Sequence, residues 1–288
     1  MWGLIAMPGS APVLGALYGL LSALVWGSGD FAGGLATRRA SVFRVLVLTS
    51  LVGLIVLVLI ALALREPWPS WADLAWAAAA GTSGVIGLAA LYRGLSMRTA
   101  AIVAPTSAVV GALFPVVVSL VLAGFPTPTQ SAGILIGLGG IWLVTRSEVH
   151  GQAERREGFL LALAAGVCFG GYFILISRVS SGAVFAPLAA AKVVATLVAL
   201  GMLAARRLPL LSPRESPVAL AAGVLDAGGN VFFLLASRVT RLDVAAVFSS
   251  MAPAVTVIFS ALLLHERVSR RQWLGVGVCL LATALLAI

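Results

Sequence analysis

Ten apolar stretches, each long enough to cross a bilayer, run through the 288 residues of this chain. A bilayer core demands about 20 consecutive apolar residues. Within it every backbone polar group must be paired internally, so stretches of this kind form helices. The sequence predicts helices near residues 13–36, 42–64, 72–93, 100–122, 130–145, 158–178, 186–205, 217–237, 244–264 and 272–288. We therefore expect an all-α integral membrane protein with ten transmembrane helices.

The second five stretches repeat the first five. Residues 88–103 (LAALYRGLSMRTAAIV) align with residues 233–248 (FLLASRVTRLDVAAVF), which places Arg93 opposite Arg238. Two further matches follow the same order: Trp26-Gly27 with Phe169-Gly170, and Gln130-x-x-Gly133 with Gln272-x-x-Gly275. The sequence thus predicts two five-helix repeats, residues 1–145 and 158–288, joined by a cytoplasmic linker at residues 146–157. Duplicated bundles of this kind commonly form a transport path between their halves.

The composition excludes a water-soluble protein. Hydrophobic residues make up 61% of the chain, charged residues 10%, and the mean hydropathy is +1.10, which would leave a globular protein almost no polar surface. The net charge of +9 lies almost wholly in short connections beside lipid headgroups. No basic face interleaved with stacking aromatic residues is present, so we expect a lipid bilayer and no nucleic acid as partner.

The arginines predict the orientation of the chain. Alternate connections, beginning with the one between the first two helices, contain fourteen arginines: Arg38, Arg39, Arg44, Arg93, Arg98, Arg146, Arg155, Arg156, Arg206, Arg207, Arg214, Arg267, Arg270 and Arg271. The opposite side has four: Arg65, Arg178, Arg238 and Arg241. We expect the chain to lie in the cell inner (plasma) membrane. Because cytoplasmic loops carry the basic excess, both termini should lie outside the cytoplasm. With five helices per unit, the second copy must then be inverted.

Two motifs carry a resemblance to a known family. They are WGSGDFAGG at residues 26–34 and the junction Glu266-x5-Gln272-x-x-Gly275. With the five-plus-five arrangement and Pro253 inside the ninth helix, the chain resembles the EamA-type permeases of the drug/metabolite transporter superfamily. The resemblance implies that the chain is a ten-helix exporter or exchanger of amino acids, small metabolites, sugars or amphiphilic compounds. The first copy departs from the junction motif, because Gly124 stands where the second copy has Glu266.

Three ionisable residues fall inside predicted helices, where charge is costly and function is the default hypothesis. Asp226 lies near the middle of the eighth helix, with Asn230 one turn on. It is a candidate for binding substrate or protons, or for a structural hydrogen bond. Asp30 in the first helix could bind substrate or pair with an arginine near the interface. Lys192, the only lysine, could attract a substrate carboxylate or extend to the outer headgroups.

Uncharged candidates for the substrate path are Trp26, Tyr172, Ser249 and Ser250, together with Tyr18 and Thr256. The family resemblance implies that their helices, the first, sixth and ninth, border a central cavity. Lipid contact and helix packing are the alternative roles. No nucleophile elbow, phosphate loop or metal-ligand spacing is visible, so we expect no catalytic residue, no metal site and no cofactor.

These features favour a secondary-active transporter that exports or exchanges a small organic metabolite by alternating access, with protons as a candidate coupling ion. An intramembrane enzyme and a non-transporting membrane receptor or assembly subunit are the alternatives. The sequence leaves substrate identity and oligomeric state open. Because ionisation of a mid-helix carboxyl is costly, Asp226 is the residue at which the sequence predicts proton coupling.

Overall fold

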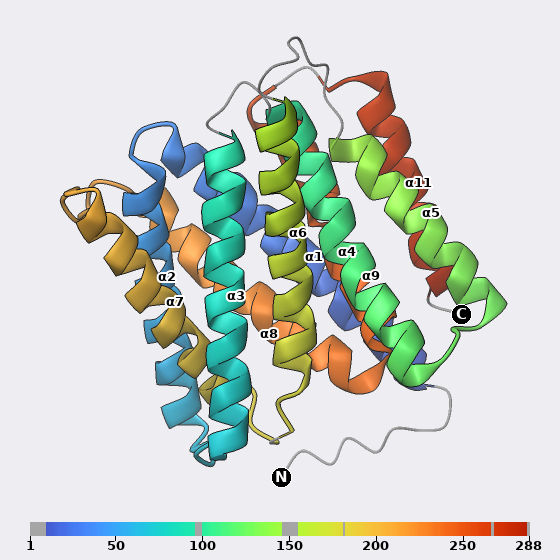
Figure 1. The fold of residues 1–288 in the computed structure, drawn as a ribbon, viewed down its shortest axis with the longest axis horizontal. Helices are drawn as coiled ribbons and strands as arrows, with labels where there is room; N and C mark the ends of the chain where they lie inside the picture. Colours follow the sequence, from blue (N-terminus) through green and yellow to red (C-terminus); the bar gives the residue numbers. More distant parts are fainter. Residues whose placement is uncertain (1–9, 96–99, 146–154, 181, 266–267, 287–288) are drawn as a thin grey trace.

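The chain folds into a bundle of helices connected by short turns (Figure 1). The computed structural model describes residues 10–95, 100–145, 155–180, 182–265 and 268–286. Its helices are α1 (Ser10–Thr37), α2 (Val42–Ala63), α3 (Trp71–Leu95), α4 (Ala100–Ala123), α5 (Pro128–Thr145), α6 (Arg155–Ser177), α7 (Phe185–Ala205), α8 (Pro217–Val239), α9 (Leu242–Ser249), α10 (Ala252–Leu263) and α11 (Arg270–Leu286). The predicted all-α architecture of ten passes is confirmed, with α9 and α10 together forming the ninth pass.

The interruption of the ninth pass was not predicted. The helix stops at Ser249 and resumes at Ala252, immediately before Pro253. Proline has no backbone N–H to donate and its ring clashes with the preceding turn, so a helix cannot run undisturbed through it. Pro115 lies inside α4, which continues through it, so the break distinguishes the ninth pass from its counterpart in the first repeat.

The passes differ in length, and the two with the shortest predicted ranges, 130–145 and 272–288, are also the shortest in the structure. Eight are long and apolar enough to cross a membrane, counting α9 and α10 as one. In the described residues α5 has 18 residues and α11 has 17. At about 1.5 Å per residue they measure about 26–27 Å, slightly below the ~30 Å of a bilayer core. Glu266 of the junction motif lies outside the described residues.

The helix contacts follow the duplication. α1 of the first repeat packs on α8 of the second, and reciprocally α6 packs on α3. α1 also contacts α9 and α10, as α6 contacts α4. Two pairs join equivalent helices directly, α2 with α7 and α5 with α11, and α5 lies beside α11 at one edge of the bundle in Figure 1. This reciprocity is the arrangement of two inverted five-helix repeats.

Individual contacts support the aligned registers. Gly27 lies against Ala252 and Val255 of the ninth pass, so closely that a Cβ would clash, and its counterpart Gly170 is also too close to Phe114 of the fourth pass to accept a Cβ. The starts of α5 and α11 carry the same capping box. The side chain of Gln130 accepts from the Thr127 N–H at 3.3 Å, and that of Gln272 accepts from the Ser269 N–H at 3.0 Å.

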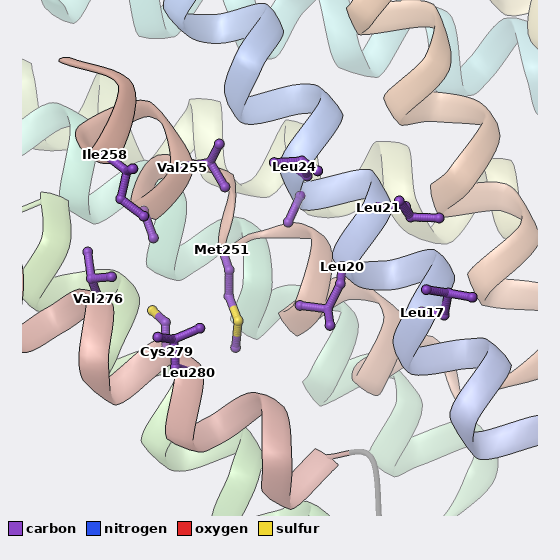
Figure 2. A pocket seen from close by; sticks show the side chains of 12 residues that line it. Leu17, Leu20, Leu21, Leu24, Met251, Val255, Ile258, Val276, Cys279 and Leu280 are labelled. Atoms are coloured by element: carbon purple, nitrogen blue, oxygen red, sulfur yellow. The ribbon is translucent and has the colours of Figure 1, made fainter. Parts of the chain in front are cut away.

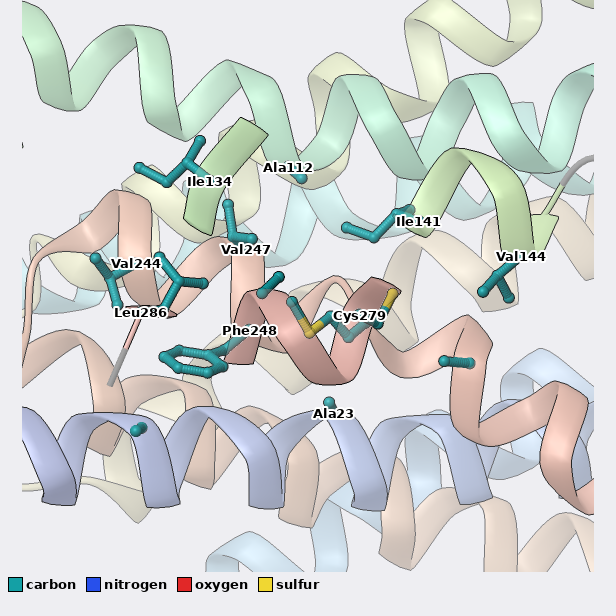
Figure 3. Close-up of a cluster of buried hydrophobic side chains, with 14 of the residues drawn as sticks. Ala23, Ala112, Ile134, Ile141, Val144, Val244, Val247, Phe248, Cys279 and Leu286 are labelled. Carbon is teal, nitrogen blue, oxygen red and sulfur yellow. The ribbon is translucent and has the colours of Figure 1, made fainter. Parts of the chain in front are cut away.

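A hydrophobic core joins the two repeats. Figure 3 shows it where Ala23 of α1, Ala112 of α4 and Ile141 of α5 surround Phe248 of α9 and Cys279 of α11. The outer faces of the bundle expose many large apolar side chains, as a surface in contact with lipid requires. The turns α1–α2 and α7–α8 lie at one end of the bundle, and the turns α2–α3, α4–α5 and α6–α7 lie at the other (Figure 1).

Candidate functional site

Four polar side chains from three helices meet inside the bundle. Lys192 of α7 donates from its ammonium to the carboxylate of Asp226 on α8, forming an ion pair. Tyr172 of α6 donates from its hydroxyl to the amide oxygen of Asn230 on α8. The Asn230 amide donates to the backbone carbonyl of Asp226 and approaches its carboxylate at 3.4 Å. We call Lys192, Asp226, Asn230 and Tyr172 the polar cluster.

The local sequence explains how the polar cluster forms. Asp226 and Asn230 are one turn apart and therefore share a face of α8. The side chain of Lys192 passes Gly53 of α2, with its Cε 3.6 Å from where a Cβ would lie. Lys192 therefore turns inward to Asp226 and does not extend to the outer headgroups. Its side chain is 15% exposed and that of Asp226 is 38% exposed, so the carboxylate is the accessible partner.

Aromatic rings border the polar cluster. The Trp26 ring of α1 covers Gly229 of α8, where no side chain would fit. It lies 5.7 Å from the ring of Phe173 and 6.0 Å from that of Phe233, measured between ring centroids. Ser22, one turn before Trp26, donates to the Gly229 carbonyl at 3.0 Å. The first repeat thus contributes one ring, Trp26, to a site whose charges and other two rings come from the second.

Asp30 lies one turn beyond Trp26 on α1. The neighbouring Gly29 faces α8, where an added Cβ would lie 3.4 Å from the Asp226 backbone nitrogen, and Phe31 packs on Phe259 of α10 at 5.8 Å between ring centroids. Asp30 therefore points between α8 and α10, about 120° around α1 from the outward-facing Leu24. It is exposed.

The serine candidates lie at the interruption of the ninth pass. Ser249 is 1% exposed, and its hydroxyl has no hydrogen-bond partner among the described residues. Ser250 follows as the C-cap of α9 and is partly buried. Thr256 donates to the Gly27 carbonyl at 2.9 Å and so joins α10 to α1. The structure gives none of the three a hydrogen bond to the polar cluster.

Some polar groups at the site were missed from the sequence. Thr196 lies one turn after Lys192 on α7, is buried, and has no hydrogen-bond partner for its hydroxyl in the described part of the chain. Ser22 and Gly53 contact the site through α1 and α2. The four-residue spacing from Lys192 to Thr196 and from Ser22 to Trp26 was the available signal.

Several polar side chains in and beside the polar cluster have no polar counterpart in the other repeat. In the register that aligns residues 88–103 with 233–248, Asp226 corresponds to Gly81 and Asn230 to Val85. In the register of Trp26-Gly27, Tyr172 corresponds to Gly29, and Asp30 to Phe173. Packing glycines recur in both repeats, whereas these polar side chains occur once. The repeat fold itself therefore does not require polar side chains at these positions.

A separate, wholly apolar groove opens between α1, α10 and α11 (Figure 2). Its volume is about 280 Å³, and Leu17, Leu24, Met251, Ile258 and Leu280 are among the side chains that line it. It offers no polar group that could orient a ligand. The described residues also contain no group of three or more His, Cys, Asp or Glu side chains suited to a metal ion.

Comparison with known proteins agrees with this architecture. One solved crystal structure is similar over 94% of this chain and 95% of its own, with a TM-score of 0.72 and 23% sequence identity, which shows the fold. No curated protein matches the chain. The model of the EamA-like transporter family matches twice, at residues 13–146 and at residues 156–288. The chain therefore belongs to the EamA-like transporter family.

Proposed function

We propose that this transporter is a secondary-active exporter or exchanger of a small organic metabolite and that the polar cluster is its binding site. The observation that carries the proposal is the Lys192–Asp226 ion pair. It joins two helices within the spanning segments, beside Asn230, Tyr172 and the Trp26 ring. Charges are costly at such depth and are retained where they bind ions or substrates.

The composition of the site suits a small molecule with both polar and apolar parts. Asp226 and Asn230 supply charge and hydrogen bonds, while the partly exposed Trp26 ring supplies apolar surface and is backed by the buried rings of Phe173 and Phe233. Ligand sites are commonly apolar walls with a few placed polar groups. An amino acid-like or amphiphilic compound fits this description.

Alternating access supplies the mechanism. α1 belongs to the first repeat and α6, α7 and α8 to the second, so a rocking motion of one repeat against the other would change the surroundings of the bound molecule. Protons are the proposed coupling ion. The chain is proposed to lie in the cell inner membrane with both termini outside the cytoplasm, because the described arginine-rich turns α1–α2 and α7–α8 lie at the same end of the bundle.

The intramembrane enzyme and the receptor or assembly subunit remain alternatives that one experiment separates. Metabolites released by a deletion strain and by an overexpressing strain are compared, and the released compound is then tested for uptake into proteoliposomes. The expected result is accumulation that is lost in Lys192→Met, with a matched variant in the apolar groove, Leu24→Ile, as control. Product formation without accumulation would instead support the enzyme.

A further inference from the structure

Three ionisable side chains lie together within the spanning part of the bundle, and only two of them compensate each other. Lys192 and Asp226 form an ion pair with no net charge. Asp30 is the third, and it follows Gly29, where an added Cβ would lie 3.4 Å from the backbone nitrogen of Asp226. When Asp30 is ionised, the three side chains together carry one negative charge. When it holds a proton, they carry none.

We infer that Asp30 is the carboxyl group that takes up and releases the coupled proton, while Asp226 remains the counter-ion of Lys192. The inference rests on the proton coupling of the proposed function and identifies the residue that performs it. It moves the coupling role from Asp226, where the sequence places it, to the neighbouring helix. The proton comes from water and returns to water, so no other reactant is needed.

Asp226 is unsuited to the role because of its partner. A proton on Asp226 would leave the ammonium of Lys192, which is only 15% exposed, without a counter-ion. Removing one member of a buried ion pair leaves an uncompensated charge, which is strongly unfavourable. Asn230 and Tyr172 bond to each other and would not replace the missing negative charge.

Asp30, unlike Asp226, forms no ion pair with a basic side chain among the described residues. The helices packed on α1 present few charged groups to it: α8 presents Asp226, and the described residues of α10 include no ionisable side chain. Asp243 of α9 is held by Arg241, and Arg44 of α2 is held by Glu215. On α1's own continuation, Arg38 and Arg39 lie two turns further on, in the exposed turn after Thr37.

The exposure of Asp30 also suits exchange of a proton with water. Asp30 is exposed on the side of α1 between α8 and α10, away from the outward-facing Leu24, and this side is its proposed contact with water. Asn230 in the polar cluster is 6% exposed. Gly29 brings α1 against α8 at the level of Asp226, so a change in the contact between these helices would change the charge environment of Asp30. A carboxyl whose surroundings differ between two states can couple proton binding to their exchange.

Infrared difference spectroscopy tests the inference without a substrate. Purified protein in lipid is moved from about pH 8.5 to about pH 5.5, a range in which ordinary carboxyl groups, with values near 4, stay ionised. The expected result is a reversible C=O band of a protonated carboxylic acid. The band should be lost in Asp30→Asn and retained in Asp226→Asn. Lys192→Met should gain a second band, because Asp226 then lacks its counter-ion.

Asp30→Glu is the second variant, needed if Asp30→Asn does not fold. The frequency of the band should shift in this variant while its amplitude is kept. Absence of the band in the wild type, or its loss in Asp226→Asn with retention in Asp30→Asn, would overturn the assignment. A normal band in a protein that accumulates no metabolite would instead count against the proposed function alone.

Discussion

The ammonium of Lys192 on α7 is paired with the carboxylate of Asp226 on α8, although the two residues are 34 positions apart and each lies inside an apolar helix. The pair neutralises two charges that would each be costly within a bilayer. It also ties α7 to α8 at the level where Trp26 of α1 packs against α8. The ion pair and the packing of Trp26 on α8 therefore lie at the same level of the bundle.

The ion pair should show strong coupling in a double-mutant cycle. Lys192→Met leaves Asp226 without a counter-ion and should lower the free energy of unfolding by about 1–3 kcal/mol, less than for a fully buried pair because Asp226 is 38% exposed. Lys192→Met combined with Asp226→Asn should recover much of the loss. Thermal unfolding in detergent measures all four proteins. Additive losses would show that the pair contributes no coupling energy.

Glu66 should stabilise the start of α7. Its carboxylate accepts hydrogen bonds from the backbone N–H groups of Val184, Phe185 and Ala186 at 2.8–2.9 Å. Glu66→Ala leaves these donors without that acceptor and should cost about 1–2 kcal/mol. Glu215→Ala is the matched control, because Glu215 pairs with Arg44 at a 54% exposed surface position and should cost at most about 1 kcal/mol. Equal shifts in melting temperature would contradict the capping role.

The duplicated glycines should respond alike to added side chains. A Cβ at Gly27 would meet Ala252, and one at Gly170 would meet Phe114, so either change to alanine should cost about 1–3 kcal/mol through overpacking. Gly139 of α5 has nothing within 4 Å of the added atom. Gly139→Ala should be neutral or gain up to about 1 kcal/mol from helix propensity. Detergent melting curves of the three variants decide whether close packing is shared by both repeats.

Much of the fold follows from the sequence because the bilayer imposes simple rules. Apolar length predicts the passes, and the recurrence of Trp26-Gly27 as Phe169-Gly170 predicts equivalent packing, which the structure shows. The break after Ser249 could not be located from composition, because Pro115 is accommodated inside α4 by the same kind of sequence. Proline alone does not specify whether a helix bends or stops.

The sequence identifies most residues of the candidate site, but it does not show which of them contact one another. Asp226 and Asn230 share a helical face, so their proximity follows from spacing alone. The pairing of Lys192 with Asp226 depends on how α7 packs on α8 and on the space at Gly53, which a single sequence does not reveal. The direction of Asp30 likewise depends on which neighbours contact Gly29 and Phe31.

The last prediction concerns orientation. The connections predicted to face the cytoplasm contain fourteen arginines against four in the others. The described turns α1–α2 and α7–α8, with Arg38 and Arg206, lie at the same end of the bundle (Figure 1). Basic residues are retained in the cytoplasm during insertion, so the C-terminus should lie outside. A C-terminal alkaline phosphatase fusion should be active and a C-terminal fluorescent protein dark, with the reporters reversed when fused after Arg206. The reverse pattern would contradict the charge argument and place the Arg38 end of α1 on the outer side.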